Sequence, residues 1–220
     1  MEVQAVTFDL DDTLAVVDRD RATILEEAAR SVGAPPLRRE DYLAAHAEVE
    51  AAHTREPIFE AVLKRAGIGG VDPEALAEAY RRRIGQQLRP VYGAEALLER
   101  LGTLMPVGLI TNGPERAQWD KLERLGWTDQ FDAIVISGRV GAHKPDPIPF
   151  KAASDRLGIE PEEILHIGDH PVHDVIGAER AGFEAIQVVE RDFRGEVGHS
   201  TLVREDLTTE LPQLAAPAIH

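Results

Sequence analysis

The sequence contains no cysteine. This absence excludes a disulfide framework, a thiolate nucleophile and a cysteine-ligated zinc site, and it is compatible with the reducing cytoplasm, where we expect the protein to act. No segment approaches about 18 consecutive apolar residues, so we do not expect the chain to span a membrane. The first residues do not combine a basic segment with a long apolar core, so we do not expect a secretion signal.

Basic residues are scarce relative to acidic ones. The chain has 24 Lys and Arg against 39 Asp and Glu, which gives a formal net charge of -15. An excess of negative charge argues against a nucleic-acid backbone as the main partner. Low-complexity composition is also lacking, and 220 residues are enough for one large domain or for a domain with a smaller one inserted.

The most informative stretch lies near the start of the chain. Residues 3–8 are apolar and rich in β-branched and aromatic side chains, which predicts a buried strand. Asp9, Asp11 and Asp12 follow directly, at the end of a strand where open α/β sheets bind ligands. We therefore predict that Asp9 and Asp11 act as nucleophile and proton donor around a divalent cation. A calcium-binding EF-hand loop is disfavoured, because Leu14 stands where that loop needs glycine.

Residues 18–89 show helical periodicity and no convincing strand. We predict four helices there. The first is capped by Asp18 or Asp20 and the second carries Tyr42, while Pro57 starts the third and Asp72 with Pro73 starts the fourth. Four helices without strands predict a small helical bundle.

From residue 90 onward, strands alternate with helices. We predict strands over residues 105–110, 133–136, 164–167 and 184–189, an edge strand near Leu202, a helix at 147–157 and a final amphipathic turn with Leu207, Leu211 and Leu214. Strands separated by helices pair in parallel. The predicted fold is thus a doubly wound, mostly parallel, Rossmann-like α/β sheet. Its catalytic core domain would comprise residues 1–17 and 90–220, with residues 18–89 inserted as a helical cap domain.

Polar side chains suited to one reaction follow several of these strands. The set is Asp9, Asp11, Thr111, Lys144, Asp169 and Asp174. A carboxylate can attack phosphorus and form an aspartyl-phosphate. Mg²⁺ would offset the repulsion between that carboxylate and an anionic ester, and a lysine and a threonine would hold the phosphoryl oxygens. A second aspartate two residues further on could protonate the leaving alcohol and then activate water.

These residues carry a resemblance to a known family. Asp9-Leu10-Asp11-Asp12-Thr13, Thr111-Asn112-Gly113, Lys144-Pro145-Asp146 and the segment Gly168–Asp174 resemble, in order, the four motifs of the haloacid dehalogenase superfamily. The helical insert is similar to that superfamily's α-helical cap. The resemblance implies Asp9 as nucleophile, Asp11 as general acid/base, and Thr111, Asn112 and Lys144 as phosphate-binding residues. It also implies metal binding by Asp9, the Asp11 carbonyl and Asp169, with Asp174 supporting the metal site or Lys144.

The same resemblance favours phosphate esters as substrates. Haloacid dehalogenases lack an aspartate at the position of Asp11, and phosphonate-cleaving members also lack it. Phosphomutases keep both aspartates, so a sugar phosphomutase is one alternative, and a non-catalytic binding module on the same fold is another. We predict a Mg²⁺-dependent phosphohydrolase acting on a small soluble phosphomonoester, such as a nucleoside monophosphate, phosphoglycolate or a sugar phosphate.

Several polar residues also have structural interpretations. Thr111 alone would often be a helix cap, and Lys144 alone would often be a solvated loop residue; their occurrence together favours the catalytic interpretation. His166 is predicted to be a packed core residue, and His170 and His173 are predicted to have structural or surface roles. In the insert, His46, His53, Arg55 and Arg81–Arg83 could face an anionic substrate, although such residues more often form a solvated helix face. Phe59, Tyr80 and Trp119 are predicted core residues.

Overall fold

A parallel sheet forms the centre of the computed structural model, which describes residues 3–49, 55–189, 201–206, 209 and 211. The sheet has six strands in the order β5-β4-β1-β6-β7-β8, and every neighbouring pair is parallel. The strands are β1 (Ala5–Phe8), β4 (Val107–Thr111), β5 (Ala133–Ile136), β6 (Ile164–Gly168), β7 (Glu184–Val189) and β8 (Thr201–Val203). The predicted doubly wound α/β fold is confirmed.

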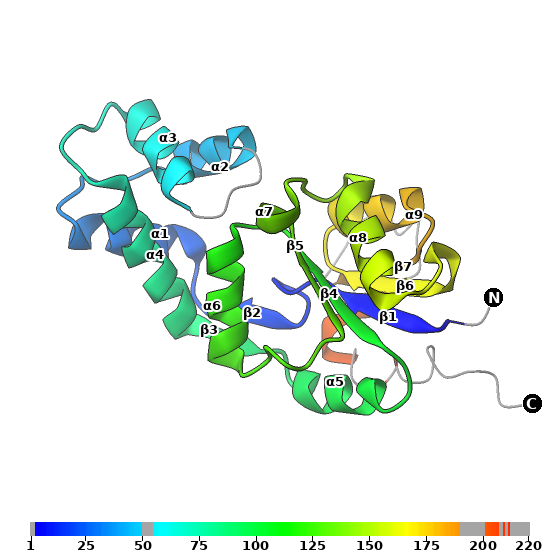
Figure 1. The fold of residues 1–220 in the computed structure, drawn as a ribbon. Coiled ribbons are helices and arrows are strands. Elements are labelled where there is room, and N and C mark those ends of the chain that lie inside the picture. Colours follow the sequence, from blue (N-terminus) through cyan, green and yellow to red (C-terminus); the bar gives the residue numbers. More distant parts are fainter. Residues whose placement is uncertain (1–2, 50–54, 190–200, 207–208, 210, 212–220) are drawn as a thin grey trace, which may run out of the picture.

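Helices cover both faces of the sheet (Figure 1). They are α5 (Ala94–Gly102), α6 (Glu115–Leu125), α7 (Ser137–Val140), α8 (Pro147–Leu157) and α9 (Gly177–Arg180). Side chains alternate along a strand, so Val6 and Phe8 share one apolar cluster with residues of α5 and α6. Ala5 points to the opposite face, where it belongs to a cluster with residues of α8 and α9. Both faces of β1 are therefore buried.

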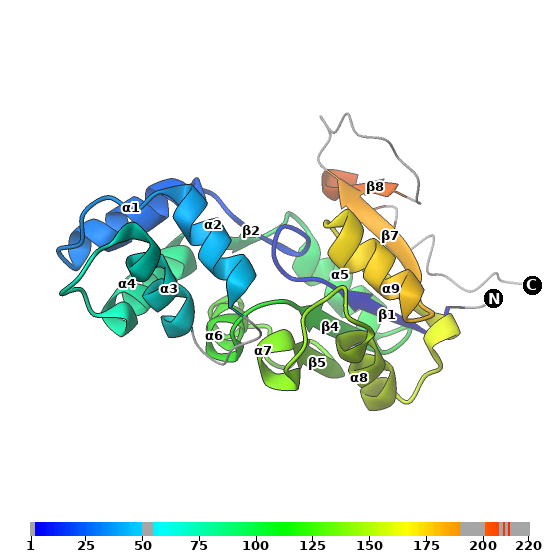
Figure 2. The same ribbon diagram turned by 90° about the horizontal axis from the view of Figure 1, so that it is seen from above.

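A second group of helices packs around an apolar cluster of its own, apart from the sheet (Figures 1 and 2). These helices are α1 (Arg21–Ser31), α2 (Arg39–Glu48), α3 (Glu56–Ala66) and α4 (Pro73–Gln87). Phe59 and Tyr80 lie at the centre of this cluster, and their rings meet edge-on with centroids 5.5 Å apart. Both are core residues, as predicted. Trp119, by contrast, is only partly buried at the margin of the sheet cluster.

The sequence signals for helix termini act at the expected places. The side chain of Asp20 accepts a hydrogen bond from the Thr23 amide at the start of α1, and that of Asp72 accepts one from the Glu74 amide at the start of α4. Each bond satisfies an amide that the first turn of a helix leaves without a partner.

The prediction that residues 18–89 contain no strand was wrong at one end. The chain enters the helical group through β2 (Ala15–Val17) and leaves it through β3 (Leu88–Pro90), and these strands pair antiparallel. Val17 lies opposite Leu88 in this pair. Each strand has only three residues, too few for an alternating pattern to show in the sequence.

Two local features differ from what the sequence indicates. The alternation of strands and helices implies a regular helix after Asp169, between the strands at 164–167 and 184–189, but the chain there forms a π-helical turn, Pro171–Ile176, that continues into α9. The short helix α7 was not predicted. Short 3₁₀ turns lie at Pro161–Glu163 and Arg204–Asp206. The edge strand at Leu202 is confirmed, whereas Leu207 and Leu214 of the predicted final turn lie outside the described residues.

Within the described residues, none of the helices combines the length and the apolar character that crossing a membrane requires.

Candidate active site

The predicted site residues come together at the carboxyl ends of three adjacent strands. Asp9 follows β1, Thr111 is the last residue of β4, and Asp169 follows β6. Lys144 reaches the same place from the segment between α7 and α8. Nine residues line a pocket there: Asp9, Asp11, Asp12, Asn112, Lys144, Asp169, His170, His173 and Asp174.

A buried lysine joins two of the carboxylates. The Lys144 Nζ donates hydrogen bonds to Asp9 Oδ1 at 2.7 Å, to Asp174 Oδ1 at 2.5 Å and to the Ile110 carbonyl at 2.6 Å. Burial by itself would lower the pKa of Lys144, but the charges of Asp174 and Asp9 raise that pKa to about 12. Lys144 is therefore a fixed positive charge in the floor of the pocket.

Three carboxylates form a group that could hold a metal ion. One oxygen from each of Asp9, Asp169 and Asp174 lies within 4.8 Å of the others. Burial raises the pKa of Asp9 well above its ordinary value, and burial together with the Asp174 and Asp12 charges raises the pKa of Asp169 to about 7. A bound cation would offset the burial and the charge repulsion that raise these pKa values, and an all-oxygen donor set fits Mg²⁺.

The side chain of Asp11 belongs to a different set of contacts. Its Oδ2 accepts hydrogen bonds from Lys121 Nζ and, at 3.3 Å, from Gln118 Nε2. Its Oδ1 lies 3.7 Å from a guanidinium nitrogen of Arg21 and has no hydrogen-bond partner among the described residues. Burial alone would raise the pKa of Asp11, but Lys121 and Arg21 hold it well below its usual range. The carboxylate of Asp11 thus lies beside the metal-binding group and outside it.

Thr111 and Asn112 differ in how their side chains are used. The buried Thr111 hydroxyl has no hydrogen-bond partner among the described residues, which leaves it available to a phosphoryl oxygen. Both ends of the Asn112 amide instead bind the Lys144 backbone. Its Oδ1 accepts from the Lys144 amide at 2.9 Å, and its Nδ2 donates to the Lys144 carbonyl at 3.0 Å. In this arrangement the Asn112 side chain positions Lys144.

His166 extends the polar network under the site. It is fully buried, as predicted for a core residue, and its two ring nitrogens lie 3.0 Å from Thr7 Oγ1 and 3.3 Å from Asp174 Oδ1. Burial lowers the pKa of His166, so the ring is neutral and orients Asp174 through a hydrogen bond.

The two other histidines near the site have structural contacts. His170 Nδ1 accepts hydrogen bonds from the Val172 and His173 amides, so the imidazole caps the π-helical turn. The rings of His170 and His173 stack with centroids 3.8 Å apart. These contacts agree with the predicted structural roles.

The sequence did not point to Gln118, Lys121 or Arg21, although all three contact Asp11 or lie beside it. One sequence feature could have indicated two of them. Gln118 and Lys121 are three residues apart, so they lie on one face of α6, next to the apolar stripe of that helix. Asp12, which had no predicted role, adopts a left-handed backbone (φ 58°) and forms an ion pair with Arg21 at 3.2 Å.

Residues of the helical group have mixed environments. Arg55 is buried, contrary to the usual solvated helix face, and His46 is partly buried, with a pKa that burial and the nearby Arg55 and His143 lower to about 4. Arg81 pairs with Glu78 and Asp120, Arg82 is exposed and Arg83 binds the Ala79 carbonyl, while His53 lies outside the described residues.

Comparison with known proteins gives a consistent family. The model of the haloacid dehalogenase-like hydrolases matches residues 3–182. The glyceraldehyde 3-phosphate phosphatase of Methanopyrus kandleri is 31% identical over 198 residues, which cover 84% of each chain. The phosphoserine phosphatase of Thermus thermophilus is 39% identical over 144 residues, covering 64% of this chain and 57% of the relative.

A solved structure of a 2-haloacid dehalogenase from Pseudomonas syringae pv. Tomato is also similar. It is 27% identical, with a TM-score of 0.73 over 97% of this chain and 100% of that one. The same fold therefore accommodates both phosphatases and a dehalogenase among these relatives.

Proposed function

The chain belongs to the haloacid dehalogenase-like hydrolases, and from this membership we propose that it is a Mg²⁺-dependent phosphatase of small phosphomonoesters. The observation that carries the proposal is the presence of Asp9 and Asp11 in one pocket with different partners. Asp9 accepts a hydrogen bond from Lys144 and belongs to the cluster of Asp9, Asp169 and Asp174. The Asp11 carboxylate lies outside this cluster and accepts a hydrogen bond from Lys121. The two carboxyl groups can thus take two different roles.

The first step is attack on phosphorus. Asp9 donates an oxygen lone pair to the phosphorus of the ester, and the bond between phosphorus and the leaving alkoxide breaks as the aspartyl-phosphate forms. Asp11 gives a proton to the departing oxygen. Asp11 must be protonated at that moment, and the negative charge of the bound phosphate favours this form.

The second step hydrolyses the aspartyl-phosphate. Asp11, now ionised, takes a proton from a water molecule as that water attacks phosphorus. The bond between phosphorus and the Asp9 oxygen breaks, which releases inorganic phosphate and restores both carboxyl groups. Lys144 and the Thr111 hydroxyl hold the phosphoryl oxygens, since this chemistry depends mainly on position and charge.

Mg²⁺ would be held by Asp9, Asp169 and the Asp11 carbonyl, with Asp174 in support. When bound, it would neutralise the repulsion between these carboxylates and the phosphate. The oxygen donors and the raised pKa values of Asp9 and Asp169 support this assignment.

A dehalogenase is disfavoured because a departing halide needs no proton, which would leave Asp11 without a purpose. A sugar phosphomutase would use the same two aspartates, but the phosphatase relatives favour hydrolysis. A non-catalytic binding module would not need the full set of reacting groups.

The proposal also assigns different roles to two parts of the chain. Residues 1–17 and 90–220 would be the catalytic core domain, and residues 18–89 the cap that excludes water and selects the leaving group. The separate apolar cluster of α1–α4 supports this division. The absence of cysteine supports a cytoplasmic location.

The test is phosphate release from a panel of metabolite phosphates, with Mg²⁺ and with a chelator. We expect release that needs Mg²⁺ and that disappears in Asp9→Asn, which keeps the shape of the side chain and removes its charge. Wild-type turnover by Asp9→Asn would contradict the mechanism. Formation of an isomeric phosphate from a sugar phosphate supplied with its bisphosphate would instead indicate a mutase.

A further inference from the structure

The two oxygens of the Asp11 carboxylate have different surroundings. Lys121 Nζ and, at 3.3 Å, Gln118 Nε2 donate hydrogen bonds to Asp11 Oδ2, and both donors belong to α6. Asp11 Oδ1 has no hydrogen-bond partner among the described residues and lies 3.7 Å from a guanidinium nitrogen of Arg21. Helix α6 therefore anchors this side chain through one oxygen and leaves the other without a partner.

The anchored oxygen is not the one that can give up a proton. A lysine ammonium and an amide nitrogen donate hydrogen bonds and accept none, so a proton on Asp11 Oδ2 would point at another donor. The proton that Asp11 passes to the leaving oxygen therefore belongs on Oδ1. A general acid must lie within hydrogen-bond reach of the atom that it protonates, so the direction of Oδ1 matters for the reaction.

Gln118 connects Asp11 to the segment that follows β4. Its Nε2 donates a second hydrogen bond, of 2.8 Å, to the Asn112 carbonyl. The amide lies over Gly113, where a Cβ would overlap Nε2, so a side chain at that position would displace it. Gly113 also has a φ of 143°, which favours glycine. The Asp11 carboxylate and the segment after Thr111 thus share one anchor.

Stability does not account for these two buried polar side chains. Lys121 is 3% exposed and Gln118 is 1% exposed. Apolar residues of the same volume often stabilise a fold as well as a buried ion pair does. Gln118 Oε1 is enclosed and has no hydrogen-bond partner among the described residues, which costs further stability. A role in orienting Asp11 explains why both side chains are polar.

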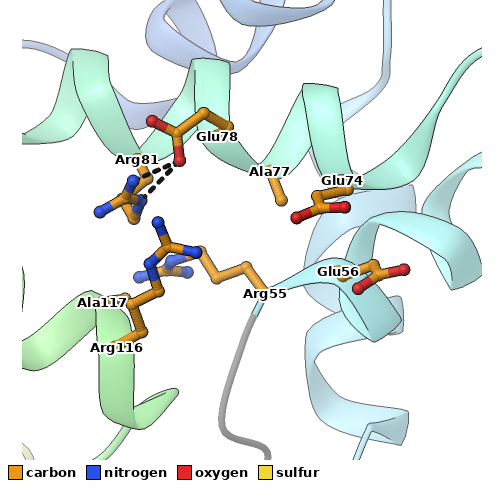
Figure 3. A pocket seen from close by; sticks show the side chains of 8 residues that line it. All are labelled: Arg55, Glu56, Glu74, Ala77, Glu78, Arg81, Arg116 and Ala117. Atoms are coloured by element: carbon orange, nitrogen blue, oxygen red, sulfur yellow. Dashed lines mark hydrogen bonds and ion pairs between the residues drawn. The ribbon is translucent and has the colours of Figure 1, made fainter.

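Helix α6 is itself held against α4 of the helical group. Figure 3 shows Arg81 of α4 paired with Glu78 and facing α6. Arg81 also pairs with Asp120, the residue directly before the anchoring lysine. One turn further along α4, a Cβ at Gly85 would overlap the Arg124 side chain, so the two helices approach closely there. The donors to Asp11 are therefore carried on a helix whose position is fixed.

We propose that Lys121 and Gln118 are positioning residues for proton transfer, which by anchoring Oδ2 direct Asp11 Oδ1 at the leaving oxygen of the ester. This inference rests on the proposed phosphatase function, which gives Asp11 its role as acid. As the Asp9 oxygen bonds to phosphorus and the bond to the leaving oxygen breaks, the proton on Asp11 Oδ1 moves to that oxygen. Lys121 and Gln118 neither give nor take a proton in this step.

Phosphate esters whose leaving groups differ in acidity test the inference. We would measure kcat/KM with Mg²⁺ for p-nitrophenyl, phenyl and alkyl phosphates, because this ratio covers the steps up to departure of the leaving group, and an acidic leaving group needs no proton. The variants are Lys121→Met, Lys121→Arg as the conservative change, and Gln118→Leu. Lys151→Met is the matched control, since Lys151 is exposed on α8 and the substitution is the same.

We expect Lys121→Met to lower kcat/KM for alkyl phosphates by about 10- to 100-fold, as a small displacement of a reacting group does, and for p-nitrophenyl phosphate by at most about 3-fold. Gln118→Leu should cost alkyl phosphates about 5-fold, as for one lost hydrogen bond. Lys121→Arg should restore part of the loss, and Lys151→Met should match the wild type. Retained activity on p-nitrophenyl phosphate also shows that a variant is folded.

The same substitutions in an Asp11→Asn background show whether the two residues act through Asp11. Once residue 11 cannot donate a proton, Lys121→Met should no longer cost alkyl phosphates more than p-nitrophenyl phosphate. A residue that acted on phosphate binding or on stability would instead cost the same factor in both backgrounds.

Three outcomes would overturn the inference. They are wild-type rates in both Lys121→Met and Gln118→Leu, a loss by the same factor for every leaving group, and an undiminished effect in the Asp11→Asn background. Circular dichroism identifies a variant that does not fold, and the milder Gln118→Leu then decides. A wild type that releases no phosphate from any ester, or an Asp11→Asn variant whose loss does not depend on the leaving group, would overturn the proposed function itself, so the two failures can be told apart.

Discussion

Asp9 and Asp11 are two residues apart in the sequence, each contacts a buried lysine, and their pKa values shift in opposite directions. Burial raises the pKa of Asp9, and the charges of Asp174 and Asp169 add to this effect while Lys144 opposes it. Asp11 faces Lys121 and Arg21, so its pKa is lowered. The difference comes from the partners that tertiary structure supplies, because burial acts on both carboxyl groups in the same direction.

Asp11→Asn is predicted to slow hydrolysis of alkyl phosphates by about 10²- to 10⁴-fold, the usual contribution of a general acid. Hydrolysis of p-nitrophenyl phosphate should fall much less at its first step, because that leaving group departs without a proton. Burst kinetics with both substrates provide the measurement. Asp12→Asn is the matched control, since Asp12 forms an ion pair with Arg21 and has no assigned role in the reaction, and this variant should stay within a few-fold of the wild type. Equal losses with both leaving groups would rule out the role of Asp11 as acid.

His46 should make the protein less stable in acid. Its pKa is about 4 when folded and about 6.5 when unfolded, so between these values the unfolded chain binds the extra proton and stability falls as the pH falls. In His46→Gln this loss should shrink by up to about 3 kcal/mol between pH 7 and pH 4. Urea denaturation across this range measures it, with the slope of stability against pH compared at equal ionic strength. An unchanged slope would show that His46 titrates normally.

At this scale, the sequence predicted the residues that end the strands but not their partners. Asp9, Thr111 and Asp169 could be placed in one site because the carboxyl ends of parallel strands meet. Lys121 could not, because its position on a partly apolar helix surface becomes meaningful only when α6 packs beside Asp11. The use of the Asn112 amide on the Lys144 backbone likewise depends on a contact between distant segments.

At the scale of elements, local signals decide most helix boundaries. Asp72 and Pro73 start α4, and the left-handed Gly67 ends α3, where the absence of a side chain removes the steric cost. β2 and β3 escaped prediction because their pairing stabilises them more than any propensity of three residues. Long periodic segments are thus predictable, whereas short paired ones depend on their partners.

Loss of the α4 cap should destabilise the helical group. Asp72→Ala removes the side-chain acceptor of the Glu74 amide and should cost about 1 kcal/mol. Thermal and urea unfolding measure the change. Glu99→Ala, an exposed acid within α5, is the control and should leave stability nearly unchanged. Equal effects of the two substitutions would mean that the cap contributes nothing beyond its charge.

At the scale of the whole molecule, two features oppose folding in the absence of cations. They are the net charge of -15 and the close approach of the Asp9, Asp169 and Asp174 carboxylates. The repulsion among negative charges spread over the surface weakens as the concentration of any salt rises. The group of Asp9, Asp169 and Asp174 responds to a bound divalent ion, because its three oxygens lie close enough to share one. These two effects can be separated by experiment.

Mg²⁺ is predicted to raise the melting temperature at constant ionic strength, since an ion that binds only the folded state adds about 2.7 kcal/mol at one hundred times its Kd. Asp169→Asn should remove most of this shift. Asp155→Asn, an exposed acid on α8 with the same charge change, should keep it. The prediction fails if both variants respond to Mg²⁺ like the wild type.

The pairing of Val17 with Leu88 brings the two ends of the helical insert side by side. Since β2 and β3 are adjacent antiparallel strands, all four helices between them are, in terms of chain path, the loop of a single β-hairpin. That loop can be exchanged for another without altering the order of the six strands or the positions of Asp9, Thr111 and Asp169. The four helices, which we propose select the leaving group, can therefore be replaced as one unit while the reacting groups stay where the sheet places them.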